Sequence, residues 1–191
     1  MSVAAATVLR VIVGSNKTRL VVVRGNSASG KSSVAAGIRD RFGRGLALVG
    51  QDNLRRIVLR ERDVPGGKNI GLIDLTARYA LDAGYHVVVE GILYADRYGD
   101  MLARLVADHR GTSRCYYLDI PLEETLVRHA SKADPQYLAQ VNERHLQEWY
   151  RERDLLPGRL ETVIGADAPL EATVERIMNE TGLARLPATD D

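Results

Sequence analysis

The stretch Leu20-Val21-Val22-Val23-Arg24-Gly25-Asn26-Ser27-Ala28-Ser29-Gly30-Lys31-Ser32-Ser33 decides the fold of this 191-residue chain. Its first four residues are apolar without alternation, which predicts a strand that is buried on both faces, as in a parallel sheet. A loop of small residues follows, and residues 32–42 then carry apolar side chains at helical spacing. A buried strand, a glycine loop and a helix in succession indicate the first unit of an α/β fold.

The loop fits the pattern G-x-x-x-x-G-K-[ST] at every fixed position. The two glycines let the backbone turn sharply, so that its N–H groups face a phosphate at the N-terminus of the next helix. The chemistry predicts that Lys31 reaches the β- and γ-phosphates of ATP and that the Ser32 hydroxyl binds Mg²⁺, while Ser33 caps or packs. We expect the nucleotide site to comprise Gly25, Asn26, Ser27, Ala28, Ser29, Gly30, Lys31, Ser32 and Ser33.

The rest of the chain alternates apolar runs with helical patterns. Further strands are predicted at 46–49, 86–90, 114–118 and 162–164, and helices at 53–62, 70–83, 96–109, from 121, 134–154 and 170–181. This alternation predicts an α/β fold with a five-stranded, mostly parallel sheet and helices on both faces. We expect a single domain over residues 1–191, in which residues 1–19 are the least certain and Thr7–Val13 fits a strand or a helical turn.

Composition narrows the class of protein. The 26 basic residues against 25 acidic ones give a net charge of +1, which argues against a dedicated duplex-DNA binder. Only four of the 26 are lysines; the 22 arginines reflect either genome composition or a preference for phosphate, whose oxygens the guanidinium group matches. The single cysteine, Cys115, excludes an internal disulfide and a cysteine zinc site. The sequence has no membrane-length apolar run, and Arg10 interrupts the apolar stretch 3–13, so we expect a cytoplasmic protein without a membrane partner.

Two side chains follow the second predicted strand, where ligands gather in open α/β sheets. Asp52 is expected to accept the proton of an attacking hydroxyl in a phosphoryl transfer. Arg55 lies three residues further on the same helix face and is expected to hold an anionic group of the acceptor or the transferred phosphoryl. The alternatives are an N-cap role for Asp52 and a solvated position for Arg55.

Glu90 ends the third predicted strand, where a carboxylate is costly unless it is paired or does chemistry. We expect it to contact the acceptor hydroxyl or, indirectly, Mg²⁺; the alternative is hydrogen bonding to loop N–H groups. Asp119 is a rival metal-site residue, but it precedes a helix opened by Pro121, where a capping carboxylate is expected.

These segments resemble the small P-loop kinases, nearest to the zeta-toxin, chloramphenicol-phosphotransferase and polynucleotide-kinase-like families. The resemblance covers most of residues 20–182 and rests on the loop 25–32, Asp52-x-x-Arg55, the run 87–91 and the run 117–129. It implies the three-layer P-loop NTPase fold, with Asp52 as the acceptor base, Arg55 on a substrate phosphate or the reactive phosphoryl, and Glu90 at the floor of the acceptor site.

A lid is also implied by the resemblance, because kinases of this size close a helical hairpin over the phosphates. We expect this lid at about 126–150, with Arg128 as its catalytic arginine; His129 and Lys132 are weaker candidates. On the following predicted helix, Tyr150 and Arg153 are expected to contact the acceptor, whereas Trp149 fits the core face. The loop 165–168 occupies the position where related kinases hold adenine.

The function expected from this reading is transfer of the γ-phosphoryl group of ATP to a hydroxyl of a small molecule, such as an antibiotic, a nucleoside or a sugar. One alternative is a kinase of polynucleotide or nucleotide ends, with nucleic acid as partner. Others are a zeta-toxin-like kinase of nucleotide sugars and a non-catalytic ATP-binding regulator. The sequence leaves the oligomeric state open.

Overall fold

A computed structural model of the chain describes residues 11–131, 138 and 141–187. Its sheet contains β1 (Arg19–Gly25), β2 (Leu46–Gly50), β3 (His86–Gly91), β4 (Thr112–Asp119) and β5 (Glu161–Gly165). The strand order is β2-β3-β1-β4-β5, and every pairing between neighbours is parallel. The predicted α/β fold with a five-stranded parallel sheet is thus confirmed.

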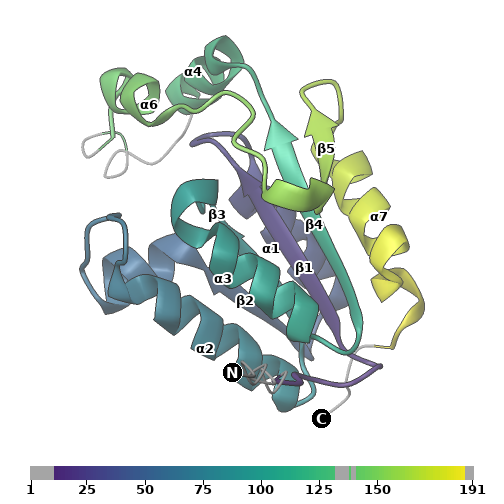
Figure 1. The fold of residues 1–191 in the computed structure, drawn as a ribbon. Coiled ribbons are helices and arrows are strands. Elements are labelled where there is room, and N and C mark those ends of the chain that lie inside the picture. The colour runs from purple at the N-terminus through teal and green to yellow at the C-terminus, as the bar shows by residue number, and fades with distance from the viewer. Residues whose placement is uncertain (1–10, 132–137, 139–140, 188–191) are drawn as a thin grey trace, which may run out of the picture.

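Helices cover both faces of this sheet (Figure 1). The described helices are α1 (Lys31–Phe42), α2 (Lys68–Asp82), α3 (Ala95–Asp108), α4 (Leu122–Ala130), α6 (Glu143–Trp149) and α7 (Leu170–Thr181). Shorter turns are the π-helix η1 (Asn53–Val58) and the 3₁₀ turns η2 (Pro157–Arg159) and η3 (Leu183–Arg185). The helices α2 and α3 lie on one face, and α1 and α7 lie on the other.

The core therefore has two layers, one on each side of the sheet. Leu20 and Val22 of β1 pack with the side chains of α2 and α3, whereas Val21 and Val23 pack with those of α1 and α7. Because both faces of β1 are covered, its sequence is apolar at every one of these positions instead of alternating. Cys115 of β4 is buried in the first of these layers.

The carboxyl ends of the strands bring three predicted segments to one edge of the sheet. In the parallel register, Glu90 lies beside Val23 of β1 and beside Gly50 of β2, and Gly25 lies beside Leu118 of β4. The helices α4 and α6 lie beyond this edge (Figure 1). A ligand crevice is expected there, because the strand order reverses at β1: the connection from β1 to β2 runs to one side of it, and the connection from β3 to β4 crosses to the other.

Two predicted helices differ in extent. The helix expected over 53–62 is a π-helix that ends at Val58, after which Arg60 takes a positive φ of 52°. The helix expected to reach Asp154 ends at Trp149, because Tyr150 has an extended backbone (φ −67°, ψ 131°). Three predictions lie wholly or mostly outside the described residues: the start of that helix at 134, the lid residue Lys132 and most of Thr7–Val13.

Val13 itself forms a parallel bridge with His109 beside the sheet. In the part of the chain that the structure describes, no helix combines the length and the apolar character needed to cross a bilayer.

Candidate functional site

The loop between β1 and α1 is shaped by backbone that only glycine adopts easily. Gly25 has a φ of 145°, and a Cβ there would lie 2.7 Å from the Leu118 carbonyl oxygen and 2.9 Å from Ser29 Oγ. Gly30 has a φ of 97°, but the space around it is open, with only Arg128 Nη1 at 3.9 Å from the place of a Cβ. The first glycine is therefore required by packing and conformation, and the second by conformation alone.

Lys31 opens α1 and is buried, and its Nζ donates a hydrogen bond of 2.7 Å to the Asn26 carbonyl oxygen. This bond folds the lysine back over the loop, as expected of a cation that faces bound phosphates. Ser32 Oγ donates to Glu90 Oε2 at 3.1 Å, and Ser33, the next residue of α1, is also exposed. The structure thus brings Ser32 and Glu90 together.

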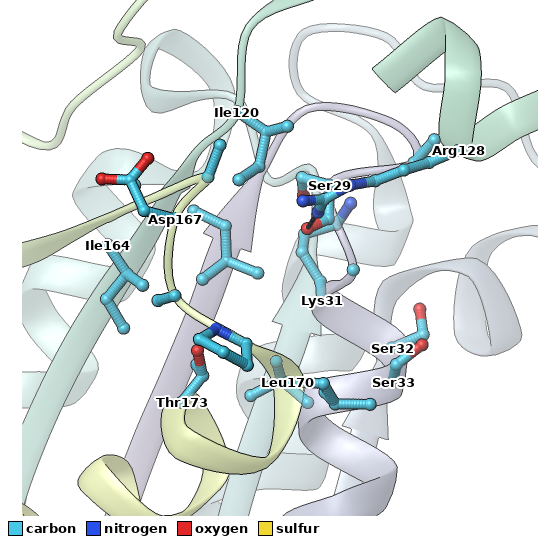
Figure 2. Close-up of a pocket in the computed structure, with 18 residues that line it drawn as sticks. Ser29, Lys31, Ser32, Ser33, Ile120, Arg128, Ile164, Asp167, Leu170 and Thr173 are labelled. Atoms are coloured by element: carbon cyan, nitrogen blue, oxygen red, sulfur yellow. Dashed lines mark hydrogen bonds between the residues drawn. The ribbon is translucent and has the colours of Figure 1, made fainter. Parts of the chain in front are cut away.

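A first cavity of about 610 Å³ lies over the N-terminal end of α1 (Figure 2). One side is formed by the loop residues 28–33, and the opposite side by the loop 165–168 with Leu170 and Thr173 of α7. Ile120 and Ile164 add apolar surface from the ends of β4 and β5. The loop that the sequence associated with adenine therefore faces the phosphate loop across this cavity.

Arg128 lies beside the phosphate loop, as the sequence predicted. It projects from α4 toward the phosphate loop (Figure 2), and its Nη1 donates to the Ser29 carbonyl oxygen at 3.3 Å. Its Nε donates to Glu124 Oε1 at 2.9 Å. The next residue, His129, is instead buried. Of these two residues, Arg128 alone lines the first cavity.

A second cavity of about 500 Å³ lies on the other side of the phosphate loop. Its polar lining is dominated by arginines that come from separate segments of the chain. The lining comprises Ser27, Asp52, Arg55, Arg56, Arg62, Asp63, Ile92, Tyr94, Arg97, Val141, Glu148, Trp149 and Arg151. The structure thus brings Asp52 and Arg55 to one cavity, as the sequence predicted.

Asp52 does not cap the helix that follows it. Its backbone is helical (φ −64°, ψ −36°) and its side chain makes no capping hydrogen bond, so the N-cap alternative is wrong. The carboxylate is instead 64% exposed and accepts from Arg55 Nη2 at 2.8 Å, with Arg56 Nη1 at 3.8 Å. The neighbouring Gln51 is buried and anchors this strand end by accepting from the Leu93 N–H at 3.1 Å.

A third, smaller cavity of about 120 Å³ joins the other two. It shares Lys31 and Ser32 with the first cavity and Asp52 with the second, and Glu90 forms part of its wall. Burial raises the pKa of the Glu90 carboxyl, while the Lys31 ammonium and the hydrogen bond from Ser32 act in the opposite direction. The oxygen atoms of Ser32, Glu90 and Asp52 are the hard donors that suit Mg²⁺.

Two predicted acceptor residues lie elsewhere. Tyr150 donates its hydroxyl hydrogen to the Ile120 carbonyl oxygen at 3.2 Å, and Arg153 is 62% exposed with Nε 3.9 Å from Asp119 Oδ2. Neither lines the second cavity, and Trp149 and Arg151 do. The helical spacing used for the prediction fails because the helix ends at Trp149 and the chain continues in extended form.

The cavity also contains residues that the sequence reasoning missed. Tyr94 is flanked by two guanidinium groups, with Arg151 Cζ at 3.9 Å and Arg97 Cζ at 4.9 Å from the ring centroid. Arg97 Nη1 donates to the Asp63 carbonyl oxygen at 2.8 Å. Their place in the sequence could have indicated this role, because Tyr94 and Arg97 closely follow the third strand, at the edge of the sheet where ligands bind.

The segment after α6 is fixed to the phosphate loop and to the core. The Asn26 side chain donates to the Arg151 carbonyl oxygen at 2.9 Å and accepts from the Arg151 N–H at 3.0 Å. Beneath it, the fully buried Arg24 pairs with Asp154 at 2.9 Å and with Glu161 at 2.8 Å. A buried cation with two carboxylate partners defines where this segment crosses the sheet edge.

Comparison with known proteins agrees with this architecture. The family model AAA_33, an AAA domain, matches residues 20–156 of this chain. An APS kinase from Mycobacterium tuberculosis, in complex with AMPPNP and APS, is 19% identical with a TM-score of 0.66, covering 89% of this chain and 99% of that one. A sugar kinase from Janibacter sp. is 24% identical with a TM-score of 0.63, covering 91% and 99%.

The tunicamycin resistance protein of Deinococcus radiodurans is 17% identical with a TM-score of 0.60, covering 91% of this chain and 99% of that one. At these identities, the likeness to the three structures shows a common fold. The sequence matches no protein of curated function.

Proposed function

The chain belongs to the AAA domain family, and on that premise we propose that it transfers the γ-phosphoryl group of ATP to a hydroxyl of a small-molecule acceptor. The observation that carries the proposal is a third, smaller cavity that shares wall residues with both larger ones. The phosphate-loop cavity and the arginine-lined cavity meet at a junction walled by Lys31, Ser32, Asp52 and Glu90. A protein that only senses ATP needs the first cavity but has no use for a junction of this kind.

The first cavity suits ATP. The loop backbone and the N-terminus of α1 hold the phosphates, Lys31 neutralises the β- and γ-phosphates, and the apolar side formed by Ile120, Ile164 and the loop 165–168 suits the adenine. The structurally similar APS kinase is described with AMPPNP, an ATP analogue, which supports this assignment. When bound between Ser32 and Glu90, Mg²⁺ would neutralise charge on the phosphates.

In the transfer step, the acceptor hydroxyl oxygen forms a bond to the γ-phosphorus as the bond from that phosphorus to the β,γ-bridging oxygen breaks. The Asp52 carboxylate takes the hydroxyl proton, and ADP leaves with the electron pair of the broken bond. Arg128, which already touches the loop through the Ser29 carbonyl, stabilises the charge of the moving phosphoryl group and helps to exclude water.

The proposal is tested with γ-labelled ATP and a panel of hydroxyl compounds that includes neutral sugars, sugar phosphates, sugar acids and nucleosides. We expect a labelled ester with at least one of them, and we expect Asp52→Asn to lower kcat by about 10²–10⁴-fold while AMPPNP binds as before. Asp40→Asn is the matched control, because Asp40 is an exposed carboxylate on α1 that faces only Arg39.

Two results would contradict the proposal at different levels. ATP binding without transfer to any member of the panel argues for a regulator instead of a kinase. Unchanged turnover by Asp52→Asn removes the base role but leaves the phosphotransferase assignment in place.

A further inference from the structure

We infer that the acceptor is an anionic alcohol, a small molecule that carries a phosphate, sulfate or carboxylate group in addition to the hydroxyl that is phosphorylated. This inference rests on the proposed function and names the substrate class of its second site. It is carried by the charge, the geometry and the unused hydrogen-bond donors of the arginine-lined cavity.

The charge of this cavity differs from that of the whole chain. Among its lining residues are five arginines, at positions 55, 56, 62, 97 and 151, against three carboxylates, at positions 52, 63 and 148. The cavity wall thus has a formal excess of two positive charges, although the entire 191-residue chain carries +1. A concave surface lined by one sign of charge concentrates ligands of the opposite sign.

Two of these arginines hold donors that the protein does not use. The Nε atoms of Arg55 and Arg97 are buried, yet neither has a hydrogen-bond partner among the described residues. Leaving a buried N–H without a partner destabilises the folded protein. Both side chains are nevertheless partly exposed in the cavity wall, 17% for Arg55 and 19% for Arg97, and a guanidinium group binds an anion through two parallel hydrogen bonds.

The same wall is held rigidly before any ligand arrives. The guanidinium groups of Arg97 and Arg151 lie against the Tyr94 ring, and the Tyr94 hydroxyl donates to the Trp149 carbonyl oxygen at 2.6 Å. Arg151 is further fixed by Asp96 at 2.8 Å. Ordering these side chains is therefore not a cost of binding, which favours a specific ligand over diffuse attraction of ions.

Arg62 differs from the others because it is exposed and forms no ion pair with any described residue. It lines only the second cavity, as does Arg97, whereas Asp52 also lines the junction with the phosphate loop. The anionic group of the acceptor is thus expected at the far end of the cavity, separated from the hydroxyl that meets Asp52.

The inference is tested with matched probes that differ in charge: ribose against ribose 5-phosphate, and glucose against gluconate. Binding is followed by the fluorescence of Trp149, the single tryptophan of the chain and a wall of this cavity, and in parallel by calorimetry. AMPPNP and Mg²⁺ are present at saturation, so that the phosphate loop does not itself capture the charged probe.

We expect at least one charged probe to bind about 10-fold or more tightly than its neutral partner, because charge-assisted bonds are about twice as strong as neutral ones. Arg62→Gln, an exposed change that leaves folding intact, and Arg97→Gln should each remove about 10-fold of this preference. Arg97→Lys keeps the positive charge and should therefore retain part of the preference for the charged probe. Arg39→Gln on α1 is the matched control, because Arg39 is an exposed arginine remote from the cavity lining.

The outcomes separate this inference from the proposed function. Equal binding of charged and neutral probes, or failure of every charged probe to bind, overturns the inference but not the kinase assignment. Charged-probe binding, together with no transfer from γ-labelled ATP to any compound of the panel, supports the anion site and contradicts the kinase assignment. In the same γ-labelled ATP assay, phosphorylation confined to an added oligonucleotide with a 5′-hydroxyl overturns the inference in favour of a nucleic-acid acceptor. Preference for ribose 5-phosphate or for gluconate identifies the anion as phosphate or carboxylate.

Discussion

The two cavities on either side of the phosphate loop are built in opposite ways. The nucleotide side is formed by two continuous segments that face each other, residues 28–34 of the phosphate loop and α1 and residues 164–170, and Leu118, Ile120, Arg128 and Thr173 complete its wall. The acceptor side is assembled from side chains that lie on η1, the turn at 62–63, the start of α3 and the end of α6. A site made by backbone within one motif tolerates little variation, whereas a site made by dispersed side chains changes with each of them.

Among the variants that compare the two cavities, the largest effect is expected on the nucleotide side. We expect Lys31→Ala to lower kcat by about 10²–10³-fold, whichever acceptor is used, because the buried ammonium is the loop's own cation for the transferred charge. The measurement is initial-rate kinetics with at least two acceptors. Lys17→Ala, at an exposed position, is the matched control. A loss of kcat that differs strongly between acceptors would contradict the separation of nucleotide binding and acceptor binding into two cavities.

A second variant tests whether the division is complete. Asn26 belongs to the phosphate loop by sequence, yet its side chain holds the main chain of Arg151, a wall of the acceptor cavity. We expect Asn26→Ala to raise the KM for the acceptor by about 10-fold, since it removes two buried hydrogen bonds of about 1 kcal/mol each. The KM for ATP should change less.

Asn26→Asp refines this test, because it keeps an oxygen that accepts from the Arg151 N–H but replaces the donor with a charged acceptor that faces the Arg151 carbonyl oxygen. It should raise the KM for the acceptor at least as much as Asn26→Ala. A larger change in the KM for ATP than in that for the acceptor would show that Asn26 acts through the nucleotide instead.

The smallest effect is expected far from both cavities. Burial, followed by the nearby charge of Arg19, lowers the pKa of His86, whose Nδ1 accepts from the Arg19 N–H at 3.1 Å. The folded state therefore keeps His86 neutral where the unfolded chain binds a proton. Stability contributed in this way is present above a pH of about 6.5 and is lost as the pH falls toward the folded pKa.

Urea unfolding at pH 7 and pH 5.5 checks this expectation. His86→Gln should reduce the loss of unfolding free energy between the two pH values by about a few tenths of a kcal/mol, without altering either KM. His109, whose pKa is also lowered by burial, is unchanged in this variant and accounts for part of the remaining slope. A slope that is identical in the two proteins would contradict the assignment to His86.

The same contrast explains what the sequence could reveal. The phosphate loop, Lys31 and Ser32 were predictable because their spacing is fixed by one turn between a strand and a helix. Asp52, Arg55 and Glu90 were placed at the correct edge of the sheet, because the carboxyl ends of parallel strands converge there. The geometry among them, such as the ion pair between Arg55 and Asp52, required the structure.

Prediction failed where it extended one periodicity across an undetected helix end. Tyr150 and Arg153 were assigned to the acceptor by helical spacing, but the backbone becomes extended at Tyr150. The extended segment that follows is held by Asn26 and Glu161, and Glu161 pairs with Arg24; all three are distant from Tyr150 in sequence. Arg62 and Arg97 carry no local pattern that distinguishes them from other surface arginines. Their convergence is a property of tertiary structure alone.

The single cysteine of the chain has a practical consequence for such measurements. Cys115 is buried in β4, and burial raises the pKa of its thiol to about 12, so that the reactive thiolate is scarcely populated at neutral pH. Thiol-directed dyes should therefore leave the folded protein unlabelled. A cysteine introduced at the exposed position of Arg144 on α6 would then be the sole target of a fluorophore, and the native sequence serves as a background-free host for distance measurements between α6 and the rest of the molecule.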